Sequence, residues 1–125
     1  MAHGIQGVGQ IRVNASDLGR AVGFYRDTLG LPLLFEVPEQ QMAFLDCGGA
    51  RLYLGVCGPG EPSQTSLVYY RVGSLDATYE DLRSRGVEFE QAPHTVYRLE
   101  KVVGRMAFLR DSEGNLLGLM EERPL

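Results

Sequence analysis

Alternating apolar and polar residues form the first regular segment of the chain. Within residues 10–15 every second residue is apolar, which is the period of a half-buried strand. From Leu18 to Leu29 the apolar residues recur three and four positions apart, which predicts a helix with one apolar stripe. Ser16 or Asp17 supplies its N-cap, and Gly30 ends it because glycine tolerates a positive φ.

The same order of elements is predicted twice, on either side of a linker at residues 58–64 that is rich in glycine and proline. The first helix is followed by three short strands, at Leu33–Val37, Gln41–Asp46 and Arg51–Val56. After the linker come a strand at Ser66–Val72 and a helix capped by Ser74 or Asp76 and ended by Gly86. The last predicted strands are Val87–Glu90, which stops before Pro93, then Arg105–Arg110 and Asn115–Glu121.

The two halves can be aligned with each other. Residues 10–18 correspond to 67–75, and Phe44-Leu45 to Phe108-Leu109, so the repeat is about 57 residues long. That length exceeds a solenoid unit and predicts an α+β protein of two tandem β-α-β-β-β modules. We expect one domain over 1–125, with module one at about 5–57 and module two at about 65–122. The helices would cover the outer faces of a mixed sheet whose other faces curve round a shared cup.

Composition excludes several classes of protein. The chain has 125 residues, 44% hydrophobic and 22% charged, which is enough for a buried core without disulfides or metal. A net charge of −4 argues against nucleic acid or an anionic membrane as a partner. No signal peptide and no apolar run of about 20 residues is present, so we expect a cytoplasmic protein in which Cys47 and Cys57 stay reduced.

Two segments resemble a known family over almost the whole chain. Residues 16–31 read SDLGRAVGFYRDTLGL, and residues 108–115 read FLRDSEGN, with Ser112 where proline is usual. Both are similar to signatures of the vicinal-oxygen-chelate superfamily, which includes glyoxalases, bleomycin resistance proteins and extradiol dioxygenases. The resemblance implies the two-module fold, but a fold alone does not settle a function.

In metal-dependent members of that superfamily, four strand positions hold a divalent ion. The resemblance places them at Gln10 and Leu67 in the first strand of each half, and at Tyr53 and Gly118 in the last. Leu67 and Gly118 have no donor atom, while a divalent ion requires several imidazole, carboxylate or thiolate ligands. We therefore expect no metal and no other cofactor, with a divalent metal as the alternative.

Strand alternation also predicts which residues line the cup. Arg12 and Arg71 take matching positions, either as an exposed rim or as partners of an anionic ligand group. Tyr53 and Tyr69 either pack in the sheet or form an aromatic wall. The predicted ligand-binding set is Gln10, Arg12, Tyr53, Leu67, Tyr69, Arg71 and Gly118.

His94 is the candidate general base, in a segment predicted as a connection between strands. The alternative is a surface or hydrogen-bonded loop histidine. Glu100, Lys101 and Arg105 are predicted to form a solvated charged loop. Glu121 and its neighbour Glu122 are predicted to be a frayed, exposed end.

Two functions follow from these observations. The first is a metal-free protein that binds a small aromatic or amphipathic molecule, as a homodimer, in the manner of the drug-sequestering members of the family that it resembles. The second is an enzyme, a metal-dependent lyase, isomerase or dioxygenase, or one using metal-free acid–base chemistry by His94 or a tyrosine.

Overall fold

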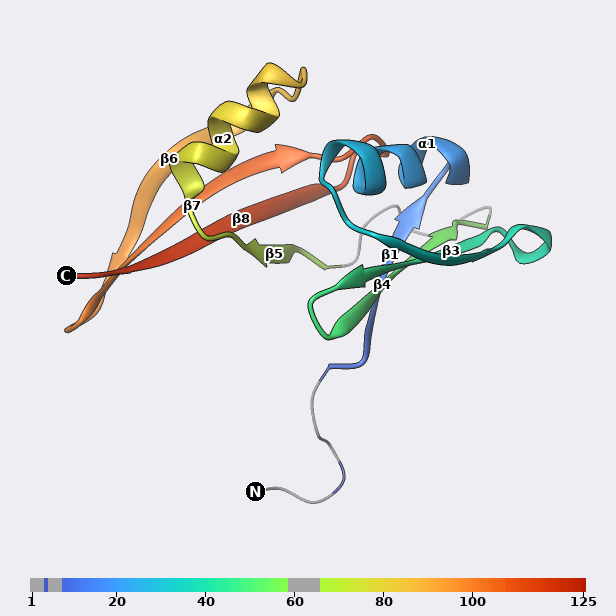
Figure 1. Cartoon of the computed structure of the whole chain (residues 1–125), viewed down its shortest axis with the longest axis horizontal. Helices are drawn as coiled ribbons and strands as arrows, with labels where there is room; N and C mark the ends of the chain where they lie inside the picture. Colours follow the sequence, from blue (N-terminus) through green and yellow to red (C-terminus); the bar gives the residue numbers. More distant parts are fainter. Residues whose placement is uncertain (1–3, 5–7, 59–65) are drawn as a thin grey trace. The chain divides into compact units, whose positions relative to one another are not determined.

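A computed structural model describes residues 4, 8–58 and 66–125, and the chain divides into two compact units, Met1–Ser63 and Gln64–Leu125 (Figure 1). Each unit contains one helical segment and a four-stranded mixed sheet. The α+β class and the tandem β-α-β-β-β modules are therefore confirmed. The single domain and the shared cup stay predictions. His3 and all of the predicted linker except Gly58 lie outside the described residues.

Unit 1 begins with β1 (Gln10–Ala15) and α1 (Leu18–Val22), followed by a π-helical segment at Gly23–Thr28. Its other strands are β2 (Leu33–Val37), β3 (Met42–Cys47) and β4 (Ala50–Val56), with one 3-10 turn at Pro38–Gln40. The strand order is β1-β4-β3-β2, with β1 parallel to β4 and the other pairs antiparallel.

The helix of unit 1 starts and stops where the sequence predicts, but its second half is wider than an α-helix. The Asp17 carboxylate accepts the N–H of Arg20 at 3.0 Å and caps the first turn. At the other end the Leu29 N–H donates to the carbonyl of Phe24, five residues back, at 2.9 Å, which is the π-helical spacing. Gly30 follows with a φ of 82°, so it is the left-handed residue that ends the helix.

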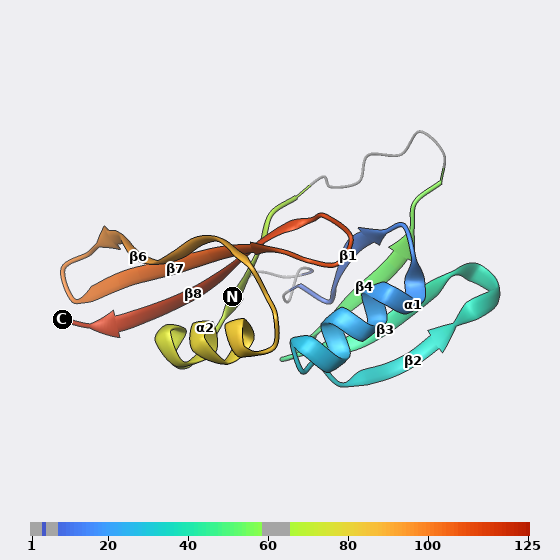
Figure 2. The same ribbon diagram turned by 90° about the horizontal axis from the view of Figure 1, so that it is seen from above.

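Unit 2 contains β5 (Val68–Arg71), α2 (Leu75–Ser84), β6 (Phe89–Arg98), β7 (Val102–Arg110) and β8 (Leu116–Pro124). The strand order β5-β8-β7-β6 repeats that of unit 1, with β5 parallel to β8. Figure 2 shows α1 and α2 each lying along the sheet of its own unit.

The prediction that a strand ends before Pro93 is wrong. β6 continues through Pro93 to Arg98, so His94 lies within a strand and not in a connection. Proline is tolerated there because β6 is the edge strand of its sheet, where a missing N–H costs no ladder hydrogen bond. Shifts of register on both sides of His94 allow the strand to bend.

One face of each sheet is covered by the helix of its unit, and this interface forms the core. Few apolar side chains of the helical segments are buried, and the buried strand residues that face them are two positions apart along each strand. In unit 1 they are Ala21, Val22 and Tyr25 against Val13, Ala15, Ala43, Leu45, Leu52 and Leu54. In unit 2 they are Leu75 and Leu82 against Ala107, Leu109, Leu117 and Leu119.

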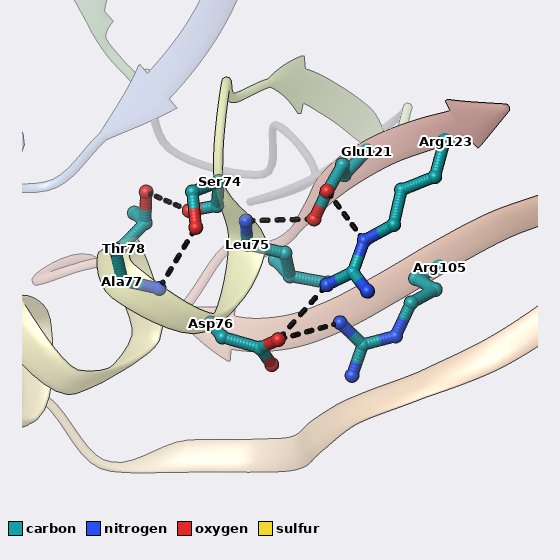
Figure 3. A network of polar contacts seen from close by, with 8 residues as sticks. All are labelled: Ser74, Leu75, Asp76, Ala77, Thr78, Arg105, Glu121 and Arg123. Atoms are coloured by element: carbon teal, nitrogen blue, oxygen red, sulfur yellow. Dashed lines mark hydrogen bonds and ion pairs between the residues drawn. The ribbon is translucent and has the colours of Figure 1, made fainter.

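A carboxylate at the end of the chain fixes the start of α2 (Figure 3). Glu121 accepts the backbone N–H of Leu75 at 2.8 Å and the Nε–H of Arg123 at 2.7 Å. It is only 8% exposed, so the prediction of a frayed end is wrong for Glu121. Its carboxylate satisfies a free N–H in the first turn of the helix, where negative charge is also favoured.

Asp76 extends this network to β7. Its Oδ2 accepts hydrogen bonds from Arg105 and Arg123, both at 2.9 Å, while Ser74 caps the helix through the Ala77 N–H at 3.2 Å. The prediction that Arg105 belongs to a solvated loop is therefore also wrong. The bond to Arg105 holds the pKa of Asp76 below its usual range, and the bond to Arg123 does the same for Glu121.

Cys47 and Cys57 are free of any disulfide, and burial raises the pKa of the Cys47 thiol. None of the helices in the described residues is long and apolar enough to cross a membrane.

We predict that Glu121→Gln lowers the free energy of unfolding by about 1–2 kcal/mol, because a charged acceptor at the helix start is replaced by a neutral one. Urea denaturation measures this change. Glu100→Gln removes the same charge from an exposed residue and should change stability by less than about 0.5 kcal/mol.

The difference in the free energy of unfolding between wild type and Glu121→Gln should also depend on pH. Since folding lowers the pKa of Glu121, its contribution is present at neutral pH and is lost as the pH falls through that lowered value. The two stability curves should therefore converge in acid. A gap of the same size at all pH values would contradict this account.

Candidate functional site

The face of each sheet opposite its helix is called here the helix-free face. Because side chains alternate along a strand, the residues between the buried core positions project onto it. Gln10, Arg12 and Tyr53 lie on this face of unit 1. Tyr69, Arg71 and Gly118 lie on the helix-free face of unit 2, while Leu67 directly precedes β5 and is 37% exposed.

Three aromatic rings and a guanidinium cross the sheet of unit 1 in one row. Phe35, Phe44, Tyr53 and Arg12 are directly opposed on β2, β3, β4 and β1. The ring centroids are 4.6 Å apart for Phe35 and Phe44 and 4.9 Å for Phe44 and Tyr53, with interplanar angles of 25° and 15°. We call these four residues the aromatic row. Their spacing matches the distance of about 4.8 Å between strands, so the rings stand side by side on the sheet.

Arg12 closes the row through several contacts. Its guanidinium carbon lies 5.1 Å from the centroid of the Tyr53 ring, and its Nη1 donates to the Tyr53 hydroxyl at 3.3 Å. Its Nε donates to the Asn14 Oδ1 at 2.8 Å. A Cβ at Gly55 would lie 2.9 Å from the guanidinium carbon, so the group rests where a side chain of β4 would otherwise stand.

A second guanidinium lies next to the row. Arg51 is 5.6 Å from the centroid of the Phe44 ring. It is opposed by Gln10 on β1 and by Asp46 on β3. This face of unit 1 thus combines aromatic surface with two positive charges and the negative charge of Asp46.

In unit 2 the corresponding row has a glycine, Gly118, between two aromatic residues. Tyr69 is opposed by Gly118, and Gly118 by Phe108. The rings of Tyr69 and Phe108 are 6.0 Å apart at 78°, and a Cβ at Gly118 would lie 2.8 Å from Tyr69 and 3.1 Å from Phe108. The two rings therefore fill the space that a side chain at position 118 would take.

The structure brings His94 to this face as well. Arg71, Met120, Met106 and His94 are opposed in a second row across the four strands. The imidazole lies 6.3 Å from the Phe108 ring. One face of unit 2 therefore carries His94, Arg71, Tyr69 and Gly118. Of these, His94 was predicted to lie in a connection between strands.

The tautomer of neutral His94 follows from its hydrogen bond. Nδ1 lies 2.7 Å from the carbonyl oxygen of Ala92, and a carbonyl can only accept, so Nδ1 carries the proton. Nε2 then has a free lone pair that can accept a proton or a hydrogen bond from a ligand. The role of His94 as a general base stays a prediction.

The pairing of strands corrects one match between the halves. Arg12 is opposed by Tyr53, and Tyr69 by Gly118, so Arg12 corresponds to Tyr69. Arg71, opposed by Met120, then corresponds to Asn14, opposed by Gly55. Arg12 and Arg71 are thus one step apart in the repeat and do not occupy matching positions.

The donor atoms at the four positions at which the resemblance predicts metal ligands do not suit a divalent ion. Leu67 and Gly118 offer no side-chain donor, Gln10 offers a neutral amide, and the Tyr53 hydroxyl already accepts from Arg12. In the described part of the chain, no group of three or more histidine, cysteine, aspartate or glutamate side chains could hold a metal.

Several residues of these faces were not predicted from the sequence. These residues lie on the helix-free faces beside the predicted ones, and they are Phe35, Phe44, Phe108, Met106 and Met120. Strand alternation predicts on which face each of these residues lies, but not which residues are opposed on neighbouring strands. The pairing register of the later strands is what connects them into rows.

Comparison with known proteins gives a consistent result. The family model described as Glyoxalase/Bleomycin resistance protein/Dioxygenase superfamily matches residues 7–119. The uncharacterized protein YraH of Bacillus subtilis (strain 168) is 31% identical over 121 residues, covering 86% of this chain and 92% of YraH.

Solved structures show the same fold. A member of the glyoxalase/bleomycin resistance protein/dioxygenase superfamily from Sphaerobacter thermophilus superposes with a TM-score of 0.78 at 24% identity, covering 94% of this chain and 98% of the other. One from Nocardioides superposes with a TM-score of 0.75 at 24% identity, covering 96% and 85%.

We predict that Gly118→Ala lowers the free energy of unfolding by about 1–2 kcal/mol, because the new methyl group displaces packed rings. Alanine ordinarily stabilises a strand relative to glycine, so a loss of stability would indicate that the space at position 118 is filled. Gly73→Ala is the control, since no heavy atom lies within 4 Å of its added Cβ. Thermal denaturation compares them, and a Gly118→Ala protein as stable as wild type would show that the space is not filled.

Proposed function

The chain belongs to the glyoxalase/bleomycin resistance protein/dioxygenase superfamily, and we propose that within it the protein binds a small aromatic or amphipathic molecule without a metal ion. The proposed ligand lies on the helix-free face of unit 1. The single observation that carries this proposal is the aromatic row, which spans all four strands of unit 1.

The two ends of the aromatic row are exposed, which supports binding. Phe35 is 45% exposed, whereas Phe44 in the middle of the row is 7% exposed, and Arg12 at the other end is exposed. Rings standing side by side on a sheet present their edges outward, and a flat ligand ring meets such edges in the favourable edge-to-face arrangement. Aromatic side chains with a few polar groups are the usual lining of small-molecule sites.

The methionines support an adaptable site. Met42, Met106 and Met120 lie on the helix-free faces, in the rows next to the aromatic residues. Methionine is flexible and polarizable, so it adapts to ligands of different shape. This favours recognition by surface and shape over one fixed set of hydrogen bonds.

The metal-dependent activities of the superfamily are not supported by the residues. A catalytic divalent site requires about three protein ligands with nitrogen, oxygen or sulfur donors, and the positions of Leu67 and Gly118 supply none. The space above Gly118 is also filled by Tyr69 and Phe108. We therefore derive no step through a metal ion for this chain.

We predict that freshly purified, untagged protein contains less than about 0.1 equivalents of any transition metal, since the donor set cannot retain one. Elemental analysis by mass spectrometry measures the content. Nickel, zinc, manganese and iron(II) should also leave the melting temperature unchanged. A stoichiometric metal that stabilises the protein would contradict the proposal.

We predict that Phe35→Ala weakens binding of an aromatic probe, 2-naphthol, about threefold or more, because the exposed end of the aromatic row is removed. Calorimetric titration measures the affinity. Leu99→Ala serves as the control, because Leu99 is an exposed apolar residue, 57% exposed, outside the strands. Equal loss in both variants would indicate nonspecific binding to apolar surface.

A further inference from the structure

We propose that the ligand held by unit 1 is an aromatic carboxylate, with its ring over the aromatic row and its carboxylate bound by Arg12 and Tyr53. The inference rests on the proposed binding function and gives the chemical class of its ligand. It is carried by the hydrogen bonds of Arg12, the charges on this face and the glycine beneath the guanidinium.

The polar groups at the end of the aromatic row have more donors than acceptors. Arg12 uses Nε on Asn14 and Nη1 on the Tyr53 oxygen. Guanidinium has five N–H donors and no acceptor, so as far as the described residues go, both hydrogens of Nη2 are left for a ligand. The Tyr53 hydroxyl accepts from Arg12, and among the same residues its own hydrogen is also left to donate. Neighbouring donors from Arg12 and Tyr53 match the two oxygens of a carboxylate.

Arg12 has no acidic partner among the described residues, in which its polar contacts are those with Asn14 and Tyr53. Of the strand residues of unit 1, all of which are described, Asp46 is the acidic one on the helix-free face, and it is opposed by Arg51. The protein carries a net charge of −4. An arginine without an acidic partner among the described residues gives this part of the face a positive charge, which favours binding of an anion.

Gly55 gives this site its geometry. The added Cβ of any other residue would lie 2.9 to 3.1 Å from three atoms of the Arg12 guanidinium. The absence of a side chain lets the guanidinium lie low beside the Tyr53 ring instead of extending into solvent. Gly55 is thus a positioning residue, which acts on the ligand only through Arg12.

The aromatic row accounts for the rest of the ligand. The outward edges of the Phe35 and Tyr53 rings carry the positive part of the aromatic quadrupole. Arg51 lies beside Phe44 and is opposed by Asp46, so Arg12 is the cation left to meet an anion. A flat ring with a delocalised negative charge complements this surface better than a neutral or cationic ring does. A flat ring over Tyr53 would lie directly beside the Arg12 guanidinium, because the two residues are opposed on neighbouring strands.

The test compares two probes of nearly the same shape, 2-naphthoate and 2-naphthamide, by calorimetric titration at pH 7 with the full chain. We expect 2-naphthoate to bind about three- to tenfold more tightly, the range for a charged hydrogen-bonded pair that is partly exposed. Arg12→Gln should remove this preference. Arg98→Gln, which removes the same charge from an exposed residue of β6, should leave it intact.

The Gly55→Ala variant distinguishes the effect of the position of the Arg12 guanidinium from the effect of its charge. Arg12 stays in the chain, but its guanidinium is displaced, so the preference for 2-naphthoate should fall while the melting temperature is unchanged or raised. The melting temperature also shows that each variant is folded.

The outcomes distinguish the two proposals. Equal affinity for both probes in wild type, or a preference that survives Arg12→Gln, would overturn the carboxylate inference and leave the binding function standing. If neither probe binds to the wild-type protein, the aromatic row is not a binding surface, and the proposed function fails with the inference.

Discussion

Cross-strand register is the constraint on which the candidate site depends. Side chains alternate with a period of two along a strand, so a shift of one residue would move every side chain to the other face of the sheet. With the observed pairing, Val13, Leu52 and Leu54 are buried on one side, and Arg12, Tyr53 and Phe44 form a row on the other. Burial of apolar residues under the helix fixes the register, and the register in turn determines which polar and aromatic residues meet on the helix-free face.

Glycines within strands decide how those rows are filled. At Gly55, Gly104 and Gly118 a long side chain from the neighbouring strand lies across the missing side chain, from Arg12, Tyr97 and Tyr69 respectively. Tyr97 also donates to Glu122 across Gly104. Glycine weakens a strand interior, but it lets another group approach the backbone closely. At Gly118 the missing side chain makes room for the packing of Tyr69 against Phe108.

The sequence was sufficient for the architecture because the evidence for it is local. Apolar periods, the cap at Asp17 and the stop at Gly30 located the helix of unit 1 to within a residue, and the internal repeat gave the two modules. Three features could not be found in this way. The strand through Pro93 depends on β6 being an edge, the burial of Glu121 depends on the start of α2, and the aromatic row depends on pairing among four strands. The bond from Leu75 to Glu121 joins residues 46 positions apart, and the other two features depend on which strands pair and in which register.

Methyl NMR of the methionines tests the central claim most directly, since Met42, Met106 and Met120 lie on the helix-free faces of the two units. The protein would be labelled with ¹³C at the methionine methyl groups and at the leucine methyl groups, and titrated with 2-naphthoate. Binding on the helix-free face of unit 1 predicts saturable shifts of Met42, with small changes at the buried core residues Leu54 of β4 and Leu82 of α2. Shifts confined to these core leucines, with Met42 unchanged, would contradict the account.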